Sequence, residues 1–326
     1  MKFLAQHPDF PVLIQNTAES LALRPQLVLK DYWVTVTLRV LAANPTLRGR
    51  FLFKGGTSLS KGWKLIDRFS EDVDLLLTGV DFSAPPEKGS DRVKLMKTIR
   101  DYVSETTPLK IPNLQDQFFY FRDKNDWHTD ARYCWEMSNP PSKLSDDSLL
   151  LEMGFRGGVN PHQIVSLNSM VGDYLIQKGL KDQEDLQTFR HDFNSFDLEL
   201  LSPARTFFEK LLYLHTTLHS DFKELRTRHL YDVVQIFRKD PEVKKLIISG
   251  EYFPILSEAI NASNRWYQAN LNPDEIHLRE GLILRDEQSD ILSKAYSAEA
   301  HYYYRGQPSF ENLRQGLEEI RTSFSS

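Results

Sequence analysis

The sequence predicts a mixed α/β fold of the α+β kind, with a small mixed β-sheet flanked by helices and then a helical C-terminal half. Apolar runs suited to strands gather between residues 51 and 155, whereas apolar side chains recur at helical spacing from about residue 167 onward. The length of 326 residues favours two domains, which we place at residues 1–200 and 201–326.

The composition is that of a globular protein with a substantial core, since 40% of the residues are hydrophobic and 12% aromatic. The net charge of −5 argues against a uniformly basic surface but leaves room for a local basic groove. A single cysteine, Cys134, excludes an internal disulfide and fits a reducing compartment. The N-terminus has no signal-peptide pattern, and no apolar stretch is long enough to span a membrane. We therefore expect a cytoplasmic protein.

The N-terminal elements follow from apolar spacing and from turn residues. A strand at 51–53 ends at Lys54-Gly55-Gly56, and Thr57 or Ser58 then caps a helix that carries Leu59, Trp63 and Ile66. The further expected elements are helices at 11–22, 26–44 and 92–106, strands at 73–77 and 149–155, two strands within 116–136, and loops at 79–91 and 138–145.

The C-terminal half reads as helical. Ser202-Pro203 is a helix start, with serine as the N-cap and proline at the first helical position. Apolar residues at helical spacing follow it and predict one buried face. Further helices are expected at 227–238, 241–262, 288–302 and 309–322.

A glycine pair and an acid pair stand close together in Lys54 to Leu77 (KGGTSLSKGWKLIDRFSEDVDLLL). A glycine turn that leads into a helix is suited to holding phosphate. Asp72 and Asp74 lie two positions apart, so in a strand both carboxylates emerge on one face. Such a pair needs a neutralising cation, and Mg²⁺ prefers carboxylate oxygen together with substrate phosphate.

Each half of this pattern has an ordinary explanation. A Gly-Gly pair alone is usually a turn, and an Asp-x-Asp alone is usually a solvated strand end. The combination, with apolar strands on both sides, is much more specific. It predicts metal-assisted nucleotide chemistry with a nucleoside triphosphate as substrate and Mg²⁺ or Mn²⁺ as the metal.

The same residues resemble a known superfamily. Gly-Gly-Thr-Ser followed by Asp-Val-Asp resembles the signature of DNA polymerase beta-like nucleotidyltransferases. More narrowly, the whole segment resembles the AbiEii/MenT group, the toxins of type IV toxin–antitoxin systems. Three further segments resemble that group: KDYWV (30–34), EKL (209–211) and RHLYD (228–232). The resemblance spans about residues 25–240 and, more weakly, extends to Phe310. The gap between the glycine turn and the acids is longer than in the generic superfamily pattern. This departure affects the assignment of the phosphate-contact residues more than the assignment of the acids.

The resemblance adds three residues to the predicted site. Glu152 matches a third carboxylate of the superfamily, as a metal ligand or the base for the attacking hydroxyl; a salt bridge to Arg156 is the structural alternative. Lys210 matches the lysine that holds the triphosphate, although a helix lysine is ordinarily solvated. Asp232 matches a further site residue that orients Lys210 or the nucleotide.

Other residues complete the candidate set. The predicted phosphate contacts are Gly55, Gly56, Thr57, Ser58, Arg68, Ser70 and Lys210, and Arg226 and Arg228 are candidate RNA contacts. Arg68 has an alternative as the partner of Asp67 or Glu71. The histidines show no zinc-site spacing, and no G-x-S-x-G elbow is present.

The resemblance implies a Mg-dependent nucleotidyltransferase (EC 2.7.7-type) whose nucleotide cleft the C-terminal domain helps to form. The implied acceptor is RNA, specifically the 3′ end of tRNA, so that the enzyme blocks translation and growth and takes part in phage defence. Two alternatives stay open: a protein hydroxyl or small molecule as acceptor, and a nucleotide-binding module without turnover. The family also implies an antitoxin encoded nearby, whose mode of contact the sequence leaves open. No membrane partner is expected, and a monomer is favoured.

Overall fold

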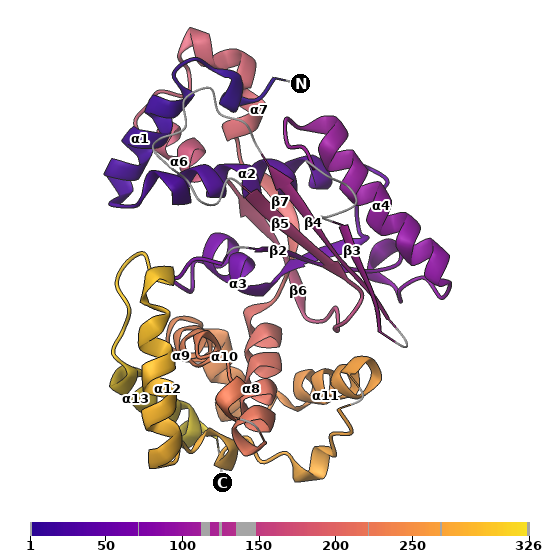
Figure 1. Cartoon of the computed structure of the whole chain (residues 1–326), viewed down its shortest axis with the longest axis vertical. Coiled ribbons are helices and arrows are strands. Elements are labelled where there is room, and N and C mark those ends of the chain that lie inside the picture. The colour runs from indigo at the N-terminus through magenta and orange to yellow at the C-terminus, as the bar shows by residue number, and fades with distance from the viewer. Residues whose placement is uncertain are drawn as a thin grey trace. The chain divides into compact units, whose positions relative to one another are not determined.

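The computed structural model describes residues 2–70, 72–111, 118–123, 126–134, 148–220, 222–267 and 269–324. It divides into two compact units. The first comprises Met1–Phe53, Glu71–Phe155 and Ile164–Leu200, and the second comprises Lys54–Ser70, Arg156–Gln163 and Leu201–Ser326. The mixed α/β fold class is confirmed (Figure 1).

The first unit is built on a seven-stranded mixed sheet with strand order β3-β4-β5-β2-β1-β7-β6. Its strands are β1 (Phe51–Lys54), β2 (Asp72–Leu77), β3 (Phe118–Asp123), β4 (Asp126–Cys134), β5 (Ser148–Gly154), β6 (His162–Leu167) and β7 (Phe196–Leu201). The pairs β1–β7 and β2–β5 are parallel, whereas β3–β4 and β4–β5 are antiparallel. Non-consecutive strands thus lie side by side, which brings residue 72 next to residue 150.

Helix α2 is the central helix of the first unit. It is buried on all sides from Leu27 to Leu41, where it packs on the sheet and on three neighbouring helices (Figure 1). Within the KDYWV segment, Asp31 Oδ2 accepts the backbone N–H of Met170 at 2.7 Å, and the Tyr32 hydroxyl donates to Asp192. The other helical segments are η1 (Leu4–Gln6), α1 (Phe10–Leu21), η3 (Val80–Phe82), α4 (Gly89–Thr106), α6 (Met170–Gln177), η4 (Glu184–Phe189) and α7 (Arg190–Phe193).

The second unit is helical. Its elements are α3 (Gly55–Thr57), η2 (Ser58–Gly62), α8 (Pro203–His219), η5 (Phe222–Glu224), α9 (Arg228–Lys239), α10 (Pro241–Ser249), α11 (Phe253–Tyr267), η6 (Pro273–Glu275), η7 (Glu280–Leu282), α12 (Asp286–Ala298), η8 (Ala300–Tyr302) and α13 (Phe310–Ser323). One core joins Leu59, Leu65 and Ile66 to the buried faces of these helices. The glycine-turn segment therefore belongs to the helical unit.

The start of α8 is as predicted. The Ser202 hydroxyl accepts the backbone N–H of Ala204 at 3.1 Å, and Pro203 occupies the first helical position. This cap fixes the register of α8 and therefore the direction in which Lys210 projects, two turns further on. No helix among the described residues is long and apolar enough to cross a membrane.

Four elements differ from the sequence predictions. The loop expected at 79–91 contains the short helix η3 and ends where α4 begins, at Gly89. The helix after the glycine turn begins at Gly55 and ends at Gly62, because the backbone turns at Lys64, where φ is +56°. The region from residue 167 is not purely helical, since β6 reaches it and β7 lies within it. The helix expected at 241–262 is two helices, separated at Gly250, where φ is +75°. The loop predicted at 138–145 lies outside the described residues.

Candidate active site

The acid pair lies on β2 in the first unit. Asp72 and Asp74 are half-buried, while Val73 between them is fully buried, as the alternation of a strand requires. Strand β5 runs parallel to β2, with Asp74 in register with Glu152. Because partners in register project from the same face of a sheet, the three carboxylates share one face. The sheet pairing brings together the acids that the sequence predicted as a set.

These carboxylates are suited to a divalent cation. Mg²⁺ and Mn²⁺ prefer carboxylate oxygen, and Mg²⁺ is commonly held by one or two carboxylates together with substrate phosphate. Among the residues that the structure describes, no three or more Asp, Glu, His or Cys side chains form a group that holds a metal alone.

The glycine turn in the second unit needs its two glycines for different reasons. Gly55 has φ of +78°, which favours a residue without a side chain. A Cβ on Gly56 would lie 2.9 Å from the Ser70 hydroxyl and 3.0 Å from Arg68 Nη2. The turn and the segment from Arg68 to Ser70 are therefore packed directly against each other.

The two hydroxyls after the glycines bond to the backbone. The Thr57 hydroxyl donates to the Ser70 carbonyl at 3.3 Å, and the Ser58 hydroxyl donates to the Gly55 carbonyl at 2.9 Å. Both side chains are buried. These contacts hold the turn in shape, while the N–H groups of Gly55 and Gly56 begin a helix and have no acceptor within it.

Asp232 lies at the centre of a buried cluster in the second unit. Its side chain has no exposed surface, and Arg68 donates to both of its oxygens, at 2.7 and 2.6 Å. Lys210 Nζ lies 3.0 Å from Asp232 Oδ2 and keeps 12% of its side chain exposed. The structure thus pairs Arg68 with Asp232 and brings Lys210 to the same carboxylate. Of the predicted alternatives, Asp67 pairs with Lys239 and Arg305, and Glu71 lies outside the described residues.

The neighbouring cations determine the protonation state of Asp232. Burial alone would raise the pKa of Asp232, but the adjacent Arg68 and Lys210 hold that pKa well below its usual range. Asp232 is therefore a carboxylate at every physiological pH, and it supplies the one negative charge that the buried Arg68 and the half-buried Lys210 share.

His229 belongs to this cluster, although the sequence did not indicate it as a site residue. Its Nδ1 lies 2.7 Å from Lys210 Nζ. Burial, followed by the neighbouring Lys210, lowers the pKa of His229 to about 2, so the ring is neutral. The spacing of three residues from His229 to Asp232 places both on one side of α9, and this spacing is the signal that could have revealed the pairing.

The segment that carries Arg68 is held by residues near the end of the chain. Residues 68 and 303 form an isolated antiparallel bridge, and the backbone N–H of Phe69 donates to the carbonyl of Tyr302 at 2.7 Å. The Tyr231 hydroxyl accepts the backbone N–H of Asp67 at 2.9 Å. Arg68 therefore reaches Asp232 from a fixed backbone.

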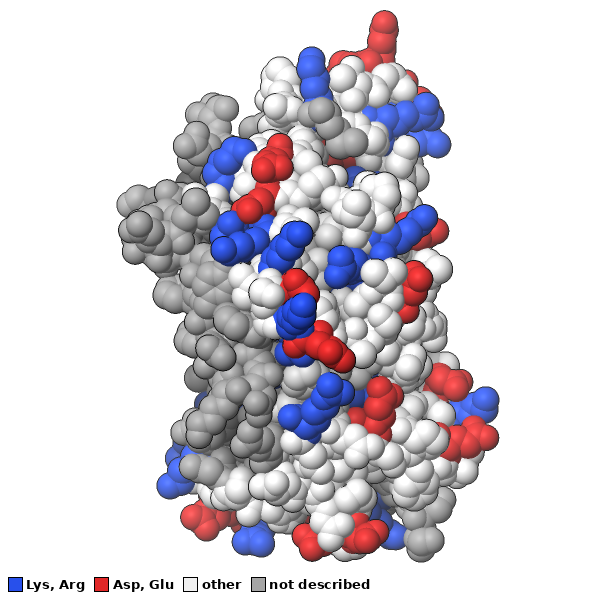
Figure 2. Space-filling model, turned by 90° about the vertical axis from the view of Figure 1, so that its right-hand side faces the viewer, with Lys and Arg blue, Asp and Glu red and all other residues white. Residues whose placement is uncertain are grey.

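The candidate RNA contacts precede α9. Arg226 is exposed and lies three residues before His229, whereas Arg228 is half-buried and is the first residue of α9, four residues before Asp232. On the face seen in Figure 2, basic and acidic side chains are interspersed, in keeping with the net charge of −5.

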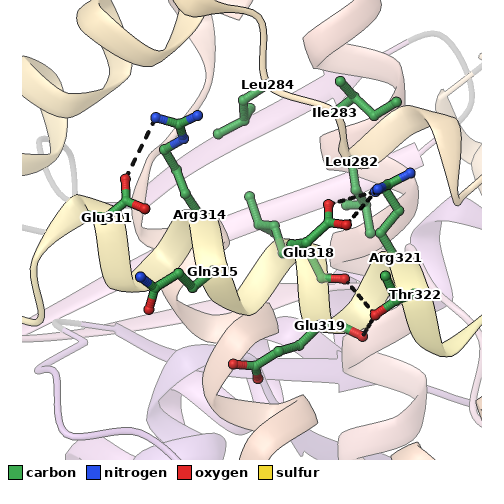
Figure 3. Close-up of a pocket in the computed structure, with 11 residues that line it drawn as sticks. Leu282, Ile283, Leu284, Glu311, Arg314, Gln315, Glu318, Glu319, Arg321 and Thr322 are labelled. Atoms are coloured by element: carbon green, nitrogen blue, oxygen red, sulfur yellow. Dashed lines mark hydrogen bonds and ion pairs between the residues drawn. The ribbon is translucent and has the colours of Figure 1, made fainter.

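A pocket of about 700 Å³ lies elsewhere in the second unit, against α13 (Figure 3). It is lined by Leu282, Ile283, Leu284, Glu311, Arg314, Gln315, Leu317, Glu318, Glu319, Arg321 and Thr322. None of these is a predicted site residue. Its arginines pair with glutamates on the same helix, so its charges are already balanced.

Paired sheet acids, together with a glycine turn packed on a buried cationic cluster, are the features of a nucleotidyltransferase. The family model described as "Nucleotidyl transferase AbiEii toxin, Type IV TA system" matches residues 39–319. The chain belongs to this family of nucleotidyltransferase toxins. Family membership implies a nucleotide substrate and an antitoxin partner.

Comparison with solved structures gives a more distant similarity. A crystal structure described as a candidate nucleotidyltransferase from H. pylori shares 13% sequence identity at a TM-score of 0.31, covering 91% of this chain and 99% of that one. This similarity is too low to indicate a shared substrate. None of the curated proteins compared with the chain matches it.

Proposed function

We propose that the protein transfers a nucleoside monophosphate from a nucleoside triphosphate to RNA, at the 3′ end of tRNA. A tRNA blocked at that end cannot be aminoacylated, so translation and growth stop. The observation that carries the proposal is the register of Asp74 with Glu152 on neighbouring parallel strands, two residues from Asp72, in a chain of the nucleotidyltransferase toxin family.

The sheet acids act on the reacting end of the nucleotide. Asp72 and Asp74 would hold Mg²⁺, with Glu152 as a further ligand or as the base. The bound ion would neutralise negative charge on the phosphate oxygens during the transfer. As the base, Glu152 takes the proton of the acceptor hydroxyl while the oxygen of that hydroxyl forms a bond to the α-phosphorus. The bond from the α-phosphorus to the bridging oxygen breaks, and pyrophosphate leaves.

The second unit supplies contacts for the triphosphate. Lys210 has an exposed part of its side chain and carries a flexible point charge, which suits a terminal phosphate. The backbone N–H groups of Gly55 and Gly56 donate to phosphate oxygen, with Thr57, Ser58 and Ser70 shaping the turn. Arg68, which is only 3% exposed, acts through Asp232.

The acceptor and its setting complete the proposal. RNA reaches the enzyme along a local basic path that includes Arg226 and Arg228. The toxin works in the cytoplasm, where tRNA and triphosphates are present. Its antitoxin either binds it, modifies it or represses its synthesis, and each of these would relieve the growth block.

The test is incubation of the protein with each labelled triphosphate, Mg²⁺ and total tRNA. The wild type labels tRNA, and Asp74→Ala lowers the rate by at least about a hundredfold, because the reaction loses several kcal/mol of charge stabilisation. Asp197→Ala, which changes an exposed acid in the same sheet, keeps the wild-type rate. Wild-type protein that labels no nucleic acid contradicts the RNA acceptor.

Transfer of label to the alternative acceptors is measured in parallel reactions. Total cell protein and a small-molecule extract replace tRNA, with the same triphosphates and the same Asp74→Ala control. Label in protein alone would assign a hydroxyl of a protein as the acceptor. If growth inhibition persists in cells that express Asp74→Ala, the protein acts by binding and not by transfer.

A further inference from the structure

Two helices of the second unit present matching pairs of side chains to each other. Lys210 and Tyr213 are three residues apart on α8, and His229 and Asp232 are three residues apart on α9. Residues at this spacing share one side of a helix. The four side chains therefore meet where α8 packs on α9.

Among the described residues, Lys210 Nζ lies close to two acceptors at this meeting point. It lies 2.7 Å from His229 Nδ1 and 3.0 Å from Asp232 Oδ2. The His229 ring is itself held, since it packs edge-on against Tyr213 with 4.9 Å between ring centroids. The imidazole thus has a fixed position from which to direct the lysine.

The geometry also assigns the proton on the ring. A lysine ammonium has donors and no acceptor, so Nδ1 accepts the hydrogen bond and Nε2 carries the proton. A protonated ring would place a second cation 2.7 Å from Lys210 Nζ, and burial favours the neutral form. His229 is therefore a neutral acceptor.

We propose that His229 is a positioning residue that fixes Lys210 Nζ in the orientation used to bind the triphosphate. This inference rests on the proposed function of Lys210. Asp232 Oδ2 gives Lys210 Nζ a contact that the lysine shares with Arg68, and a four-carbon side chain pivots easily about one such contact. The second acceptor, on a ring held by Tyr213, removes that freedom.

A pair of substitutions separates positioning from folding. His229→Leu removes the acceptor at similar volume, and nucleotide affinity falls about tenfold, the usual consequence of losing one buried hydrogen bond to a charged group. His229→Asn places an oxygen near the position of Nδ1 and restores most of the affinity. His219→Leu, on the exposed side of α8, is the matched control and changes nothing. Affinity is measured by titration with a non-hydrolysable triphosphate and Mg²⁺, and the unfolding midpoint of each variant is recorded.

A double-mutant cycle with Lys210→Ala gives the decisive result. If His229 acts through Lys210, His229→Leu has no further effect on affinity once the lysine is gone. If the two losses multiply instead, or if the Leu and Asn variants bind alike, His229 has a merely structural role and the proposal is wrong.

Failure of the proposed function has a different signature. In that case the wild type itself neither binds triphosphate nor transfers label, and Lys210→Ala changes nothing. A different result would overturn the positioning role alone. In that result the wild type binds triphosphate and Lys210→Ala does not, but His229→Leu binds as well as the wild type.

Discussion

Asp232 shows at the residue scale why one buried acid matters to two cations. It has no exposed surface and bonds to Arg68 and Lys210 at once. Asp232→Asn leaves both cations without a counter-charge, and unfolding free energy falls by about 3–5 kcal/mol, as for other broken buried ion pairs. Denaturant unfolding measures this, with Glu318→Gln, in an exposed pair on α13, as the control with a much smaller effect. Equal losses in the two variants would contradict the prediction.

The same carboxyl gives a pH prediction. Its pKa is held below the unfolded value, which is about 3.9, so its contribution to stability is fully present above that value. The contribution is lost as pH falls from about 4 toward the folded pKa. The difference in unfolding free energy between wild type and Asp232→Asn is therefore constant from about pH 7 to 5 and narrows below about pH 4. A difference that narrowed between pH 7 and 5 would point to another group.

These residues also show what the sequence could predict of the site. Lys210 and Asp232 were selected by motif, and the contact between them is observed. The partner of Arg68 could not be predicted, because it lies 164 positions away along the chain. The neutrality of His229 could not be predicted either, since it comes from burial against α8, whereas an exposed histidine in the same sequence would titrate near neutral pH.

At the scale of elements, the short helix after β1 depends on the absence of a side chain at Gly56. Gly56→Ala places a Cβ within 3.0 Å of Arg68 Nη2 and 2.9 Å of the Ser70 hydroxyl, so the segment that carries both must shift. We expect a loss of about 1–3 kcal/mol in stability together with weaker nucleotide binding.

A second glycine provides the control for that prediction. Gly250 has φ of +75° and open space around its Cβ position, so Gly250→Ala costs stability through backbone strain alone. Unfolding and nucleotide titration are measured for both variants. Gly56→Ala weakens both, whereas Gly250→Ala weakens only stability. Unchanged nucleotide affinity in Gly56→Ala would mean that the turn takes no part in binding.

The strands differ in how far the sequence revealed them. Strands β1, β2 and β5 were predicted from short apolar runs because both of their faces are largely covered. Strands β6 and β7 were missed. Residues 196–201 form a strand through parallel pairing with β1, which places Leu200 opposite Phe53, and pairing over such a distance leaves little local pattern.

At the scale of the whole molecule, the predicted acidic and cationic site residues belong to different compact units. The three acids are in the first compact unit, and Lys210, Arg68 and the glycine turn are in the second. The predicted boundary at residues 200 and 201 and the predicted nucleotide cleft stay predictions.

The net charge of −5 sets the expected strength of RNA binding. General attraction to RNA is weak in such a protein, so each local arginine carries a measurable share. Arg226→Ala removes one phosphate contact, and we expect weaker tRNA binding and a salt dependence whose slope, log Kd against log salt, falls by about one. Arg314→Ala changes an exposed arginine of the same unit that is paired with Glu311, and it keeps the wild-type slope. Filter binding between about 50 and 200 mM salt measures both. Identical slopes in the two variants would mean that the RNA path does not include Arg226. A slope near zero in the wild type would mean that the protein binds tRNA without contacts to its phosphate groups.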